Sequence, residues 1–236
     1  MSEKIAVLGA GSWGSALALL LGSTGREVRL WARDAELVES IQRTHINTRY
    51  LPNNTLPPTV LPTLNLEEAV SGAEVVVWAV PSGAFREVTQ QSASYLAPAT
   101  LLVSATKGLE ENTCLRMSEI LVELLPNAAE RTVVLSGPNL ALEMAKGVPT
   151  AAVVASKSLE AAKRVQQLVS NLPQPTFRLY TGSDVIGVEL GGAIKNVIAI
   201  GAGICDGLSY GDNSKTALVT RGLAETMRLG VALGAE

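Results

Sequence analysis

Short apolar runs alternate along the chain with segments long enough to form helices. The apolar runs predict strands at residues 5–8, 28–31, 75–79, 100–104, 132–135, 151–155 and 177–180. The segments between and after them predict helices at residues 13–23, 35–43, 66–70, 85–95, 114–125, 139–146 and 159–170. Strands that alternate with helices are typical of an α/β fold, in which helices flank a mostly parallel sheet.

Smaller features refine this pattern. Ser12 and Ser158 precede predicted helices and are expected to cap them. Residues 51–62 are rich in Pro and Asn and predict a loop. From Asp184 onward the chain is helical and rich in small residues, so we expect one domain over residues 1–182 and a helical second domain over residues 183–236. About 50 residues are too few for an ordinary domain core, so the second domain is expected to be incomplete.

Composition excludes several classes of protein. Hydrophobic residues make up 47% of the chain and the net charge is −3 without a basic cluster, which argues against disorder and against nucleic-acid binding. The two cysteines are far apart and show no metal-ligand spacing, so we expect no metal site and a reducing, cytoplasmic setting. Lys195 and Asn196 interrupt the most apolar stretch, so no membrane insertion is expected.

The chain has a single histidine, His45, in a polar stretch without an acidic neighbour to orient it. A histidine-based active site is therefore not expected. Lysine, carboxylate or tyrosine must supply any acid or base.

A glycine-rich turn follows the first predicted strand. Gly9, Gly11 and Gly14 fit the pattern G-x-G-x-x-G, and a helix and a second strand follow where a βαβ unit requires them. The first glycine allows the tight turn, the second lets the backbone approach a pyrophosphate, and the third allows close packing of helix on strand. The first domain is therefore predicted to be Rossmann-like and to bind NAD or NADP.

The end of the second predicted strand bears on the choice of cofactor. An acidic residue there usually bonds the ribose 2′-hydroxyl of NAD, whereas an arginine accommodates the 2′-phosphate of NADP. Arg33 suits the phosphate, although it could be an ordinary surface charge, and Asp34 would repel a phosphate if it faced the pocket. NADP is therefore the expected cofactor, with NAD as the alternative.

Two lysines and a polar turn are candidates for chemistry. Lys107 follows a predicted strand at the edge where α/β sheets bind ligands, and Lys195 lies in an otherwise apolar helix, where loss of hydration would favour proton transfer. Lys107 could instead be a loop charge, and Lys195 could reach solvent. The segment from Ser136 to Asn139 could cradle a substrate or phosphate, or Ser136 or Asn139 could simply cap a helix.

Together these motifs resemble those of bacterial NAD(P)-dependent glycerol-3-phosphate dehydrogenases. The resemblance covers the whole chain in order, through the glycine-rich turn, Ala105-Thr106-Lys107-Gly108, Ser136-Gly137-Pro138-Asn139, Gly192-Ala193-Ile194-Lys195-Asn196 and Thr220-Arg221-Gly222. It implies reversible reduction of dihydroxyacetone phosphate to sn-glycerol 3-phosphate for glycerophospholipid synthesis.

The resemblance also implies roles for single residues. Lys195 would be the proton acceptor in glycerol phosphate oxidation, and Lys107 would contact both cofactor and substrate. Further substrate contacts would come from Gly137, Asn139 and Asn196, although Ser or Thr is commoner than Asn at position 139. The residues expected around the cofactor, besides the three glycines, are Ser12, Trp13, Arg33, Tyr50, Phe85 and Ala141.

The family continues beyond these motifs into helices that hold an aspartate beside the lysine and an Arg-Asn pair for the substrate phosphate. These residues are not expected within the 236 residues, so the chain alone is expected to bind nucleotide with little or no NADPH consumption. The full protein is expected to be a homodimer.

Two alternatives remain open at this stage. A β-hydroxyacid dehydrogenase of the phosphogluconate dehydrogenase type also uses a lysine, but its asparagine follows about one helical turn later, whereas Lys195 and Asn196 are adjacent. A non-catalytic NADP-binding or redox-sensing module would share the glycine-rich turn but not respond to the substrate.

Overall fold

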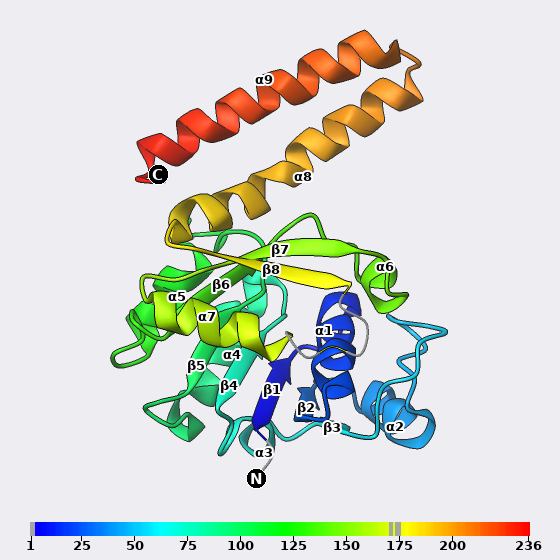
Figure 1. Cartoon of the computed structure of the whole chain (residues 1–236), viewed down its shortest axis with the longest axis vertical. Helices are drawn as coiled ribbons and strands as arrows, with labels where there is room; N and C mark the ends of the chain where they lie inside the picture. Colours follow the sequence, from blue (N-terminus) through cyan, green and yellow to red (C-terminus); the bar gives the residue numbers. More distant parts are fainter. Residues whose placement is uncertain (1–2, 170–171, 173–175) are drawn as a thin grey trace.

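An eight-stranded sheet forms the centre of the molecule, with strand order β3-β2-β1-β4-β5-β6-β7-β8 (Figure 1). The computed structural model describes residues 3–169, 172 and 176–236. The strands are β1 (Lys4–Leu8), β2 (Glu27–Trp31), β3 (Val60–Thr63), β4 (Val75–Trp78), β5 (Leu101–Ser104), β6 (Thr132–Ser136), β7 (Thr150–Ala155) and β8 (Phe177–Gly182). Neighbouring strands are parallel except for the antiparallel pair β6–β7, which confirms the predicted mostly parallel α/β fold.

Helices cover both faces of the sheet because successive side chains of each strand point to opposite faces. Ile5 and Val7 of β1 belong to the core on one face, under α1 (Ser12–Ser23), α2 (Ala35–Thr44), α6 (Ala141–Ala145) and α7 (Leu159–Leu168). Ala6 and Leu8 belong to the core on the other face, under α3 (Leu66–Val70), α4 (Ser82–Ser92) and α5 (Met117–Leu124). A 3₁₀ turn, η1 (Ala93–Tyr95), follows α4.

Strand β3 lies within the segment predicted to be a loop. It is a short edge strand that pairs only with β2 among the described strands, through Val60 to Thr63. An edge strand tolerates proline, which has no N–H to donate, so Pro62 fits there. The prediction of an unbroken loop over residues 51–62 was wrong because the turn-forming residues hid this pairing.

The two predicted serine caps have different outcomes. Ser158 caps α7 as predicted, since its hydroxyl accepts a hydrogen bond from the backbone N–H of Ala161 at 3.4 Å. The N-cap of α1 is Gly11, and Ser12 is the first residue of the helix, so the predicted cap by Ser12 was wrong. Ser170, the predicted last residue of α7, lies outside the described residues.

The last part of the chain forms a helical hairpin, α8 (Val185–Gly207) and α9 (Gly211–Ala232), which extends away from the sheet (Figure 1). Glycine allows the two helices to pack closely. A Cβ added at Gly222 would lie 2.8 Å from Cγ1 of Ile198, and one at Gly201 would lie 3.1 Å from Cδ1 of Leu218. By length and composition alone α8 could span a membrane, which is weak support for such a role.

Candidate functional site

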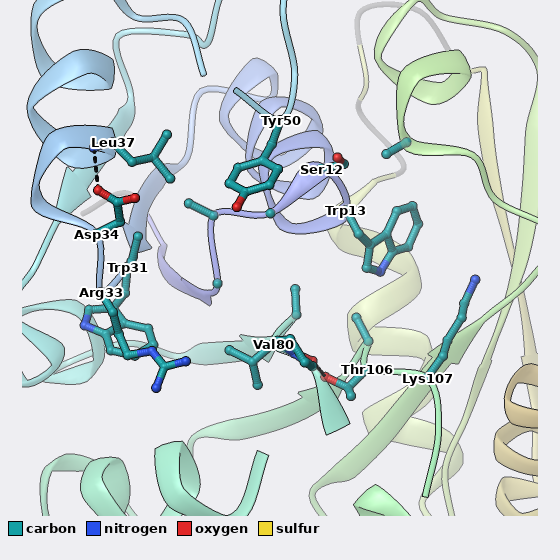
Figure 2. A pocket seen from close by; sticks show the side chains of 18 of the residues that line it. Ser12, Trp13, Trp31, Arg33, Asp34, Leu37, Tyr50, Val80, Thr106 and Lys107 are labelled. Atoms are coloured by element: carbon teal, nitrogen blue, oxygen red, sulfur yellow. Dashed lines mark hydrogen bonds between the residues drawn. The ribbon is translucent and has the colours of Figure 1, made fainter. Parts of the chain in front are cut away.

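A pocket of about 590 Å³ opens at the carboxyl ends of β1, β2, β4 and β5 (Figure 2). Its walls are the residues that follow these strands, 9–13, 31–34, 79–81 and 105–107, together with residues 139–141, Leu37 and Tyr50. Ligands of open α/β sheets bind at this edge, where the strand order reverses direction on either side of β1. The pocket is therefore the candidate cofactor site.

Each of the three glycines of the turn has a different structural role. Gly9 has φ +113°, and a Cβ there would lie 2.7 Å from the carbonyl oxygen of Ala79. A Cβ at Gly14 would overlap the carbonyl oxygen of Gly9, so only glycine allows α1 to pack this closely. A Cβ at Gly11 would meet no described atom within 4 Å, so this glycine leaves space at the pocket.

The start of α1 fits a phosphate group. Its first backbone N–H groups have no partner within the helix, and among the described residues no side chain caps it. Such a helix N-terminus attracts anions. The space beside Gly11 and these N–H groups together fit the pyrophosphate of a dinucleotide.

Arg33 and Asp34 follow β2. They line one end of the pocket, and Lys107 lies at the opposite end (Figure 2). Arg33 is 65% exposed, and its guanidinium is 3.8 Å from the Glu87 carboxylate. Asp34 is the N-cap of α2, since its Oδ1 accepts a hydrogen bond from the N–H of Leu37 at 3.1 Å. Its other oxygen, Oδ2, pairs with Arg49.

Asn47 holds the segment that carries Arg49 and Tyr50 against the glycine-rich turn. Asn47 is fully buried, and its amide Nδ2 donates to the carbonyl oxygen of Ala10 and to Oγ of Ser15, both at 2.8 Å. Its Oδ1 accepts from the N–H of Tyr50 at 3.0 Å. Tyr50 thereby lines the pocket.

Lys107 lies at the opposite end of the pocket, near Trp13 (Figure 2). Its Nζ is 5.6 Å from the centroid of the Trp13 ring and donates a hydrogen bond to the carbonyl oxygen of Gly137 at 3.1 Å. Burial, and secondarily the charge of Lys195, lower the pKa of Lys107 from its ordinary value. Lys107 is therefore a structural part of the site and not a free loop charge.

Helix α8 packs against β6. It brings Lys195 near enough for its positive charge to contribute to the lowered pKa of Lys107. A Cβ at Gly192 would lie 2.5 Å from Oγ of Ser136 and 3.9 Å from Cγ of Lys107, so a side chain there would displace the Ser136 hydroxyl. Lys195 itself is exposed, and its Nζ donates to Oδ1 of the exposed Asn196 at 2.9 Å. The expectation of a buried Lys195 was wrong. Gly192 faces Ser136 at the end of β6, whereas the side chain of Lys195 is exposed.

The turn after β6 is held against β7. A Cβ at Gly137 would lie 2.9 Å from the carbonyl oxygen of Ala151. Asn139 donates from Nδ2 to the same oxygen at 2.9 Å, while its buried Oδ1 has no hydrogen-bond partner among the described residues. Neither Ser136 nor Asn139 caps α6, whose N-cap is Leu140. Asn139 and Ala141 line the pocket.

Phe85 lies apart from the pocket. Its side chain is fully buried in the core under α4, and its ring centroid is 6.1 Å from that of Trp78. The structure gives it a packing role and does not place it on the pocket wall.

Comparison with known proteins identifies the family. Residues 4–162 match the model described as NAD-dependent glycerol-3-phosphate dehydrogenase N-terminus, and residues 184–236 match the model of the C-terminus of the same family. The chain belongs to the NAD-dependent glycerol-3-phosphate dehydrogenase family.

Individual members of the dehydrogenase family are similar over the whole chain. NAD(P)+ glycerol-3-phosphate dehydrogenases from Pelotomaculum thermopropionicum and Geobacter metallireducens are 50% and 51% identical over 100% of the chain, which covers 67% and 70% of their lengths. The crystal structure of glycerol-3-phosphate dehydrogenase from Coxiella burnetii superposes with a TM-score of 0.92 at 39% identity, over 100% of this chain and 70% of that one. These relatives do not favour a phosphogluconate-type enzyme or a sensing module.

Sequence reasoning missed Asn47 and Arg49 in this dehydrogenase site. Both contact residues far away in the chain, Ala10 and Asp34, and no local motif marks such contacts. Their position next to Tyr50 was the one available signal.

Proposed function

We propose that the protein catalyses the NAD(P)H-dependent interconversion of dihydroxyacetone phosphate and sn-glycerol 3-phosphate. The observation that carries this proposal is the position of Lys107 at one end of the pocket in a chain of this family, with α8, which bears Lys195, packed beside it at Gly192. Two cations beside the turn after β6 suit a small phosphorylated substrate, because ammonium groups bind phosphate as compact charges.

The proposed cofactor contacts follow the pocket. The N–H groups around Gly9, Gly11 and Gly14 hold the pyrophosphate, and Ser12, Trp13, Tyr50 and Ala141 line its sides. When bound, the nicotinamide supplies the hydride that reduces the substrate carbonyl carbon. Arg33 at the far end supports a preference for NADP, with NAD also accepted.

The proposed substrate residues are Lys107, Gly137, Asn139, Lys195 and Asn196. Lys195 Nζ gives a proton to the carbonyl oxygen during reduction and takes it back during oxidation. Lys107, held by Trp13 and the carbonyl oxygen of Gly137, orients the substrate beside the cofactor. The Asn196 side chain, bonded to Lys195, fixes the direction of its Nζ.

The proposed organisation has a cofactor domain at residues 1–182 and a helical substrate domain beginning at residue 183. Exposed apolar side chains on α8, such as Val197 and Ile200 at 70% and 66%, support burial against further protein, including a second copy in a homodimer. The proposed enzyme works in the cytoplasm and supplies glycerophospholipid synthesis.

The test follows NADPH consumption with dihydroxyacetone phosphate in the full protein. Lys195→Ala is expected to abolish turnover and to leave NADPH binding unchanged, because Lys195 lies outside the pocket wall. Lys163→Ala, which removes a lysine of α7, is the control and should behave as the wild type. Near-normal turnover of Lys195→Ala would refute the proton-transfer role.

A further inference from the structure

Asp34 is an acidic residue at the end of the pocket where Arg33 lies, and both of its oxygens are engaged. Oδ1 accepts from the N–H of Leu37, and Oδ2 pairs with the guanidinium of Arg49. The hydrogen bond from Leu37, followed by that from Arg49, holds the pKa of Asp34 below its ordinary value. The carboxylate is thus ionised at neutral pH, and its nearest counter-charge is Arg49.

The position of Arg49 is set by the buried Asn47 anchor. Asn47 ties this segment to the carbonyl oxygen of Ala10 in the glycine-rich turn, and the guanidinium of Arg49 lies 6.0 Å from the centroid of the Tyr50 ring. The distance between the phosphate-binding turn and Arg49 is therefore fixed by hydrogen bonds and not by a free loop. An ion pair with this support keeps more of its strength than an isolated surface pair.

A second ion pair near this end joins Arg33 to Glu87, whose groups are 3.8 Å apart. Without Arg49, Asp34 would have no ion-pair partner among the described residues. A 2′-phosphate carries up to two negative charges at neutral pH, so an uncompensated Asp34 would repel it, whereas a ribose hydroxyl could donate to that carboxylate.

We propose that Arg49 is a specificity-determining residue that makes the pocket accept a 2′-phosphate by neutralising Asp34. This inference rests on the proposed nucleotide-binding function and extends it to a residue outside the pocket wall. Arg33 remains the cation that faces the phosphate directly, and Arg49 acts through Asp34.

The experiment measures binding of 2′,5′-ADP and 5′-AMP by calorimetry, because these probes differ only in the 2′-phosphate. Arg49→Gln is expected to weaken 2′,5′-ADP binding about fivefold and to change 5′-AMP binding less than about twofold. The double variant Asp34→Asn with Arg49→Gln is expected to recover the lost affinity. Asn is as good an N-cap as Asp, so α2 keeps its cap.

Arg43→Gln is the matched control, since it removes an exposed arginine from the last turn of α2 with the same change of charge. It should leave both affinities unchanged. The proposal is overturned if Arg49→Gln leaves the ratio of the two affinities unchanged, or if the double variant binds 2′,5′-ADP as weakly as Arg49→Gln. A wild-type protein that binds neither probe would overturn the proposed function as well, which separates the two failures.

Discussion

Arg116 and Glu189 form an ion pair, with Nη1 and Oε2 2.8 Å apart, that joins the start of α5 to the first half of α8. The Glu189 side chain is only 5% exposed, and it also accepts hydrogen bonds from the N–H and the hydroxyl of Ser118, at 2.8 and 2.6 Å. This carboxylate ties α8 to the start of α5. Six residues later the same helix carries Lys195.

Removing the Glu189 carboxylate should lower the stability of the protein, because it breaks the attachment of α8 to the start of α5. Glu189→Ala leaves Arg116 and the N–H of Ser118 without their buried acceptor, and we expect a loss of about 3 kcal/mol in the free energy of unfolding. Urea unfolding followed by circular dichroism measures it. Glu160→Ala, which removes an 88% exposed carboxylate from α7, is the control and should change stability by less than about 0.5 kcal/mol.

The same carboxylate predicts a pH dependence. Burial raises the pKa of Glu189 above its ordinary value of 4.5, despite the opposing hydrogen bonds from Ser118 and the charge of Arg116. The folded protein binds this proton more tightly than the unfolded chain. The proton-linked part of the stability, as distinct from the contacts with Arg116 and Ser118, is therefore present below pH 4.5 and is lost as pH rises through the raised pKa. The stability of the wild type relative to Glu189→Gln should therefore fall with rising pH, and a constant difference would contradict this assignment.

Gly11 and Gly14 should respond differently to alanine. Gly11→Ala has space for its methyl group and should fold normally, but the methyl group would occupy the approach to the pyrophosphate and weaken NADPH binding at least tenfold, a loss of about 1.4 kcal/mol. Gly14→Ala should lower the melting temperature, because its methyl group overlaps the carbonyl oxygen of Gly9. Gly203→Ala, in an open part of α8, is the control for both measurements. Full NADPH affinity in Gly11→Ala would place the pyrophosphate elsewhere.

Lys195 should influence the titration of Lys107. Lys195→Met removes the like charge and should raise the pKa of Lys107, although not to its ordinary value of 10.5, because burial is the larger cause of the shift. NMR titration of the lysine side chains measures this. Lys163→Met should leave Lys107 unchanged, and an unchanged Lys107 in Lys195→Met would mean that the two lysines are not neighbours.

Loss of the Asn47 anchor should affect both stability and binding. Asn47→Ala removes the amide that donates to the buried Oγ of Ser15 and to the carbonyl oxygen of Ala10, at a cost of about 2 kcal/mol. The carbonyl oxygen of Ala10 then keeps the hydrogen bond from Ser15 Oγ, at 3.3 Å. NADPH binding should weaken with it, since Tyr50 loses its support. Asn54→Ala, which removes one exposed hydrogen bond to the carbonyl oxygen of Pro52, is the control for thermal unfolding and for binding. Equal behaviour of the two variants would contradict the anchoring role.

Local patterns predicted the parts of the molecule that depend on local geometry. The turn at Gly9, Gly11 and Gly14 could be predicted because strand, turn and helix are consecutive in the sequence. Gly9 and Gly14 have the steric reasons expected of them, and the role of Gly11 beside a pyrophosphate stays a prediction. The predicted helix start at Cys114 was three residues early. Cys114 has φ +56°, which ends the regular pattern in a turn, and α5 begins at Met117.

The remaining features depend on contacts between distant residues. Apolar neighbours around Lys195 suggested burial, but Val197 and Ile200 are themselves exposed, because burial in a helix depends on what packs against each face. The ion pair between Arg116 and Glu189 joins residues that are 73 positions apart in the sequence. Sequence alone does not indicate which charged residues pair across such a separation.

The reversed strand β7 has a geometric consequence for the place where α8 begins. Because β8 runs parallel to β7, it ends at Gly182, opposite Ala155, which in turn pairs with Val134 inside β6. The chain thus leaves the sheet two residues short of Ser136, and α8 passes that serine only at Gly192. An insertion of one residue in α8 between Glu189 and Lys195 would turn Lys195 by about 100° relative to the contacts of Glu189 and carry it away from Lys107. We expect this stretch of α8 to tolerate substitutions but not changes of length.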